Sequence, residues 1–193
     1  ISARILKLVN SAVFGRRVKV RSIRHAVPLL GLTTVEQVVL ALGAYDSFQV
    51  DAVPGFQPLK EQAQAFEVAT LARNLLDGEA AESAFTAGLL HDIGKLVFAA
   101  YHGDRYAVAL SEWMAGSRRL VDVEREVMGL THAEVGALML KAWEIPDEIV
   151  DAVALHHTPP AITEGPILDI RTALWLSEAV VEYPGSPRDA VDR

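Results

Sequence analysis

The sequence predicts an all-α protein, and two observations carry that prediction. Apolar residues recur at helical spacing along most of the 193 residues, and nothing beyond isolated pairs follows the alternation of a half-buried strand. Hydrophobic residues make up 51% of the composition, which is enough to build a buried core in a chain of this length. We expect a helical bundle that is preceded by an amino-terminal helical subdomain.

The amino-terminal helical subdomain is expected to cover residues 1–52. Its predicted helices are 2–14, 22–30 and 33–48. Gly31 separates the last two of these helices, since glycine commonly ends a helix. The chain begins inside a helical pattern, so we expect this subdomain to be truncated at its front. Pro54, Gly55 and Pro58 then predict a linker.

A second helical domain is expected at 56–182, followed by a tail at 183–193. Thr131 and Glu134 form a capping box that starts one of its helices, and Pro146 opens the next at its first turn. The predicted helices are 59–77, 80–101, 104–115, 121–128, 132–143, 146–157 and 167–182. Three tryptophans lie at core spacings of these helices and are expected to pack in the interior: Trp113, Trp143 and Trp175.

The charge is unevenly distributed along the chain. The net charge is −7, yet no acidic residue precedes Glu36. A basic cluster at 16–24 could contact nucleic acid or an acidic partner, or it could form a solvated loop and helix start. No aromatic residues interleave with these charges, so nucleic acid is not expected as a partner. The absence of cysteine fits a cytoplasmic location, and no apolar run is long enough to predict a membrane span.

Four of the six histidines form an ordered pattern with one aspartate. The pattern is His91, Asp92, His132, His156 and His157. Imidazole and carboxylate are ligands of divalent metals. Adjacent helical residues point about 100° apart, so His91 and Asp92 could share one ion only at a kink or helix end, or could serve two ions. The other two histidines, His25 and His102, are expected at exposed helix ends.

Lys95 follows the histidine–aspartate pair by one helical turn. Its ammonium group could meet a phosphate as a point charge, or the side chain could simply leave the core. His132 comes directly after the capping threonine, near the positive end of its helix, where a histidine could bind a metal or face an anion.

Several segments resemble one known family. Leu89–Leu96 (LLHDIGKL) resembles the signature of the HD superfamily of metal-dependent phosphohydrolases. Glu124–Ala137 (EREVMGLTHAEVGA), Ser2–Ala12 (SARILKLVNSA) and Ala26–Leu32 (AVPLLGL) are similar to the HDOD domain, the HD-related output domain of bacterial signalling proteins. The resemblance covers nearly all of residues 1–182. It implies an HD-like helical bundle for the second domain.

The sequence departs from active HD enzymes at two positions. The resemblance places Gln64 where such enzymes have an early histidine ligand, and Ser177 where they have a late aspartate, with Glu178 beside it. An amide and a hydroxyl are much weaker ligands than the groups they replace. The remaining set, the four histidines with Asp92, could still hold one ion, for which iron, manganese or zinc would suit.

The resemblance implies a regulatory output module of bacterial signal transduction that is non-catalytic or weakly catalytic. Such a module would bind signalling proteins or a nucleotide-like ligand in the former active-site cleft. The alternative is a metal-dependent phosphohydrolase that acts on a cyclic dinucleotide or a nucleotide, in which case Lys95 would assist at the phosphate. The two missing ligands favour the first reading.

Overall fold

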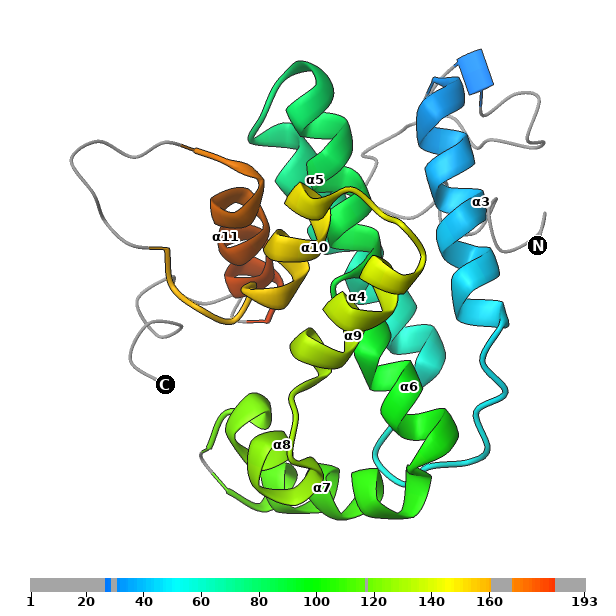
Figure 1. Ribbon diagram of the computed structural model, residues 1–193, viewed down its shortest axis with the longest axis vertical. Helices are drawn as coiled ribbons and strands as arrows, with labels where there is room; N and C mark the ends of the chain where they lie inside the picture. The colour runs from blue at the N-terminus through cyan, green and yellow to red at the C-terminus, as the bar shows by residue number, and fades with distance from the viewer. Residues whose placement is uncertain (1–26, 29–30, 117, 161–167, 183–193) are drawn as a thin grey trace. The chain divides into compact units, whose positions relative to one another are not determined.

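The computed structural model describes residues 27–28, 31–116, 118–160 and 168–182 (Figure 1). All regular structure in these ranges is helical, which confirms the predicted all-α class. The chain divides into two compact units, Ile1–Ser47 and Phe48–Arg193. The predicted helix 2–14, the basic cluster at 16–24 with His25, and the tail at 183–193 lie outside the described residues.

The first unit contributes helix α3, Leu32–Asp46, where a helix at 33–48 was expected. Gly31 precedes it with a φ of 85°, a conformation that glycine adopts at little cost. Val35, Val38 and Leu42 are buried along one face of α3, which is the periodicity that predicted the helix.

The second unit is a bundle of short helices. Its helices are α4 (Pro58–Asn74), α5 (Gly78–Leu90), α6 (Ile93–Tyr101), α7 (Gly103–Ala115), α8 (Leu120–Met128), α9 (His132–Ala142), α10 (Asp147–Ala154) and α11 (Ile170–Glu182). Helix α5 packs against α4, α10 and α11, while α9 packs against α6 and α10. Helices α7 and α8 pair with each other (Figure 1). None of the described helices is long and apolar enough to cross a membrane.

Local sequence explains where several of these helices begin and end. Pro58 occupies the first turn of α4, where a missing N–H costs nothing. The predicted capping box starts α9: the Glu134 N–H donates to Thr131 Oγ1, and the Thr131 N–H donates to the Glu134 carboxylate. Gly129 ends α8 in the left-handed conformation, with a φ of 88°.

The single helix expected at 80–101 is wrong, because the structure has two helices with a turn between them. Helix α5 ends at Leu90 and α6 begins at Ile93. His91 is the C-cap of α5, and Asp92 is the N-cap of α6. The turn lets these two adjacent side chains face one centre, which a continuous helix would prevent.

Helices α6 and α9 approach so closely that their backbones touch. A Cβ atom added at Gly94 would overlap the carbonyl oxygen of His132 and would lie 2.9 Å from the backbone nitrogen of Gly136. Glycine at position 94 therefore allows the start of α9 to lie against the start of α6. This contact places His132 beside Asp92.

Candidate metal centre

The structure brings the five predicted residues together. Asp92 comes from the turn before α6, His132 from the first residue of α9, and His156 and His157 follow α10. Each of these four offers a ligand atom within 4.8 Å of the others. A second set of ligand atoms, from His91, His156 and Glu178, meets the same condition. The two sets share His156, so they form one continuous cluster.

Asp92 is the buried anion at the middle of the cluster. Its Oδ2 atom accepts a hydrogen bond from Lys95 Nζ at 2.7 Å and lies 3.3 Å from His91 Nε2. Its Oδ1 atom lies 3.2 Å from His132 Nε2. Burial alone would raise the pKa of Asp92, but the charges of His91 and Lys95 and hydrogen bonds with His132 and His91 hold that pKa well below its usual range. Asp92 is therefore an ionised carboxylate.

Three of the histidine rings, those of His91, His132 and His156, are held in place by hydrogen bonds at their Nδ1 atoms. His91 Nδ1 lies 2.8 Å from the Gly88 carbonyl oxygen, and His156 Nδ1 lies 2.6 Å from the Val153 carbonyl oxygen. Each N–H thus donates to the backbone and leaves Nε2 directed at the cluster. Fixing one ring nitrogen in this way orients the other for a metal.

His132 is held by Glu124, a fully buried residue of α8. One carboxylate oxygen, Oε2, accepts hydrogen bonds from the backbone N–H of His132 at 2.9 Å and from its Nδ1 at 2.6 Å. Burial would lower the pKa of His132, but the charge of Glu124 and hydrogen bonds with Asp92 and Glu124 raise it to about 9. These contacts favour the imidazolium form of His132, which would lose its Nε2 proton on binding a metal.

His156 and His157 are neutral, which is the form that binds metals. Burial lowers the pKa of both rings, and the charges of neighbouring histidines lower it further. His157 Nε2 lies 2.8 Å from His132 Nε2, a distance at which the imidazolium donates a hydrogen bond to the neutral ring. Two nitrogens that each lie about 2.1 Å from one ion are roughly 3.0–3.4 Å apart, so a small separation of the two rings would bring this pair to the spacing of two ligands.

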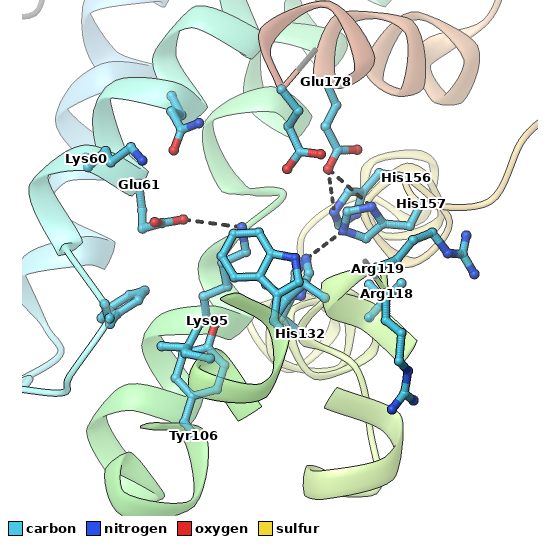
Figure 2. Close-up of a pocket in the computed structure, with 18 of the residues that line it drawn as sticks. Lys60, Glu61, Lys95, Tyr106, Arg118, Arg119, His132, His156, His157 and Glu178 are labelled. Carbon is cyan, nitrogen blue, oxygen red and sulfur yellow. Dashed lines mark hydrogen bonds and ion pairs between the residues drawn. The ribbon is translucent and has the colours of Figure 1, made fainter. Parts of the chain in front are cut away.

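Glu178 is the functional residue that sequence reasoning passed over. It projects from α11 toward the paired histidines (Figure 2), with Oε1 3.3 Å from His157 Nδ1 and 3.8 Å from His156 Nε2. Ser177, which the family resemblance places at the ligand position, instead donates a hydrogen bond to the Ala173 carbonyl within its own helix at 2.7 Å. The sequence did contain an acidic residue at this place, because Glu178 follows Ser177 directly and is one methylene longer than the expected aspartate.

The donor set fits a divalent metal. His156 Nε2 and Glu178 Oε1 are buried atoms without a hydrogen-bond partner among the described residues, and a buried polar atom left unpaired is costly. Burial, together with the charges of Glu182 and Asp92, raises the pKa of Glu178 well above its usual value, although the charge of Lys95 opposes this rise. A cation bound there would satisfy both atoms. Mixed nitrogen and oxygen ligands suit iron, manganese or zinc.

A cavity of about 490 Å³ opens beside the cluster. His132, His156, His157, Glu178 and Lys95 line its inner end, and Gln64 lines its α4 wall. The basic residues Lys60, Arg118 and Arg119 line it as well (Figure 2). Arg119 is held by Asp122 and Arg118 by Glu126, so each of these arginines already has a carboxylate partner.

The expectation that the tryptophans pack in the interior is wrong for two of them. Trp113 is 40% exposed and Trp143 is 44% exposed. Trp113 and the half-buried Trp175 line the cavity, where their rings offer flat apolar surfaces. His102, by contrast, is exposed at the end of α6, as expected.

Replacing Glu178 with glutamine should lower the metal content of the purified protein. The amide keeps the shape of the side chain but removes the charge that makes it a ligand. We expect the variant to retain clearly less metal than the wild type in elemental analysis after dialysis against limiting metal. Ser177→Ala is the matched control, because the neighbouring hydroxyl faces its own helix. A Glu178→Gln protein with unchanged metal content would remove Glu178 from the ligand set.

A buried histidine–aspartate cluster within an all-α bundle defines a protein of the HD type. The HDOD domain family model matches residues 1–159, which is most of the chain. The chain therefore belongs to the HDOD domain family.

The chain is also similar to individual proteins. It is 29% identical over 163 residues to an uncharacterised protein of Treponema pallidum (strain Nichols), covering 83% of this chain and 31% of that protein. A presumed phosphohydrolase from Shewanella amazonensis SB2B is 27% identical with a TM-score of 0.71, covering 98% of this chain and 67% of that one. The MmoQ response regulator of Methylococcus capsulatus (Bath) is 25% identical with a TM-score of 0.59, covering all of this chain and 76% of that one.

Proposed function

We propose that this chain is a regulatory output module of bacterial signal transduction, acting in the cytoplasm without catalysing a reaction. Membership of the HDOD domain family and the similarity to a response regulator support a signalling role. The module would act through its cavity and metal centre, by binding a ligand or a signalling protein there.

Two observations support a non-catalytic role: Lys95 is already ion-paired, and Gln64 replaces a metal ligand with a neutral amide. Lys95, the cation nearest the cluster, is already paired with Asp92 at 2.7 Å and with Glu61 at 3.3 Å. Gln64 offers a neutral amide to the cavity where the family resemblance implies a histidine ligand. Hydrolysis of a phosphate ester requires both the metal and the phosphate to be held in a fixed geometry, and a misplacement of about 1 Å can cost about a hundredfold in rate.

The size and the lining of the cavity support the proposal that the ligand is nucleotide-like. Its volume of about 490 Å³ lies in the usual range for small-molecule sites. Trp113 and Trp175 could stack on a flat base, and the exposed Lys60 at its rim could meet a phosphate. The ion would serve such a ligand, or a partner protein, as an electrostatic anchor.

Glu178 favours the second candidate, a working metal-dependent phosphohydrolase of cyclic dinucleotides or nucleotides. Its carboxylate supplies the acidic ligand that the sequence had seemed to lose at Ser177. The ligand set is then short by one group, at Gln64. The similarity to a presumed phosphohydrolase points in the same direction.

We expect the metal-loaded protein to hydrolyse cyclic dinucleotides and simple phosphodiesters no faster than the metal alone. The test compares product formation by wild type and by Asp92→Ala, each loaded with iron, manganese or zinc. Wild-type turnover of about 1 s⁻¹, a usual lower rate for enzymes, that disappears in Asp92→Ala would establish the phosphohydrolase instead.

Gln64→His extends this test, because Glu178 leaves only that ligand to restore. Metal content should rise in the variant, and a trace of hydrolysis would identify Gln64 as the substitution that abolishes catalysis in the wild type. The matched control is Gln57→His, which introduces a histidine at the exposed start of α4 on the same cavity wall. An equal rise in both variants would show that a histidine in the cavity, rather than one at position 64, binds the extra metal.

A further inference from the structure

Lys95 lies between two carboxylates that come from different helices. Asp92 Oδ2 is 2.7 Å from its ammonium nitrogen, and Glu61 Oε2, from α4, is 3.3 Å from the same nitrogen; Figure 2 shows the contact with Glu61. Two carboxylates thus contact the single ammonium group of Lys95.

The two carboxylates are held differently. The Asp92 side chain is 6% exposed and fixed within the histidine cluster. The Glu61 side chain is 17% exposed, makes the longer contact with Lys95, and lines the cavity from the first turn of α4. Glu61 lines the cavity and Asp92 does not, so an anion that reaches Lys95 through the cavity would lie beside the Glu61 carboxylate.

We propose that Glu61 acts as an internal anion that covers the cavity side of Lys95 and makes the cavity select against ligands with a phosphate or carboxylate at that position. A second anion placed against Lys95 would lie beside Glu61, and like charges in contact in a partly desolvated site repel strongly. The favoured ligand carries a neutral group at the Lys95 end and its anionic group near Lys60. This inference rests on the proposed function, because it presumes that the cavity holds a ligand.

Inorganic phosphate is the probe, and the whole chain with its native metal content is the sample. Glu61→Gln keeps the size of the side chain and removes its charge. We expect the dissociation constant for phosphate, measured by isothermal titration calorimetry, to fall at least about tenfold, since the removed charge lies within a few ångströms of the bound anion. Metal content must be equal in wild type and variant by elemental analysis, so that phosphate on the ion does not account for the change.

Glu67→Gln is the matched control, because Glu67 is an exposed acid of the same helix that does not line the cavity. It removes the same charge from the molecule and should leave phosphate affinity within about twofold of wild type, since exposed charges are screened by salt. Adding Lys95→Gln to Glu61→Gln should return the affinity to the wild-type value. That reversal would identify Lys95 as the group that Glu61 covers.

Unchanged phosphate affinity in Glu61→Gln, or an equal gain in Glu67→Gln, would overturn the proposal. Should Glu61→Gln fail to fold, Glu61→Asp provides a second test, because shortening the side chain by one methylene withdraws the carboxylate from Lys95 and should give a smaller gain. The result is separable from the proposed function. Failure of wild type to bind any nucleotide counts against the ligand site, whereas phosphate titration tests Glu61 alone.

Discussion

Replacing His156 and His157 together with alanine should remove the metal from the protein. His156 offers a ligand atom to both sets of the cluster and His157 to one of them, and burial keeps both rings neutral. Loss of a group that merely orients a ligand costs about 10–100-fold in metal affinity, so loss of two ligands should cost at least about a hundredfold. Elemental analysis and competition with a chelator dye would measure the change.

His102→Ala is the control for this double variant. His102 is exposed at the end of α6, outside both ligand sets, so its removal should leave the metal content unchanged. Stoichiometric metal in the double variant, equal to that in wild type, would refute the assignment of the ligands.

Gly94→Ala should destabilise the second unit more than any surface substitution. A methyl group at this position would overlap the backbone of His132, and neither backbone can give way without separating α6 from α9. We expect a loss of about 3 kcal/mol in the free energy of unfolding, the upper part of the usual cost of overpacking. For a chain of this size that corresponds to a fall of roughly 6–12 °C in Tm. The variant should also bind metal more weakly, because His132 would move away from Asp92.

Gly116→Ala serves as the comparison. Gly116 is an exposed residue of the same unit, and a Cβ atom there would meet its nearest neighbour at an ordinary 3.5 Å. Its substitution should change Tm little. A Gly94→Ala protein as stable as Gly116→Ala would mean that the two helices are not in backbone contact in solution.

The helices of the second unit could be predicted because their signals are local. Periodic apolar residues gave their approximate ranges, and the capping box at Thr131 and Glu134 gave the start of α9. The break between α5 and α6 could not be predicted in this way, because apolar residues at helical spacing lie on both sides of it. At this turn Asp92 contacts His132 of α9, a tertiary contact that no local pattern records.

The site was predictable as a set of residue types but not as a geometry. The histidines and Asp92 were found because their ligand chemistry is uncommon in a helical core. Glu178 was missed because a shift of one residue along a helix turns a side chain by about 100°, and only the packing of α11 decides whether position 177 or 178 faces the cluster. The cover that Glu61 forms over Lys95 depends on two helices distant in sequence.

The bond between Glu124 and His132 couples one surface helix mechanically to the metal centre. One carboxylate oxygen of Glu124, on α8, accepts hydrogen bonds from both the ring and the backbone of His132. A tilt of α8 would therefore turn that ring or break both hydrogen bonds. Coupling of this kind is reciprocal: whatever shifts α8 must change the affinity for the ion, and the ion must change the preferred position of α8 by the same free energy. If the proposed function holds, a bound ion would therefore favour one position of α8, and that helix would carry the effect of the ion to the surface of the second unit.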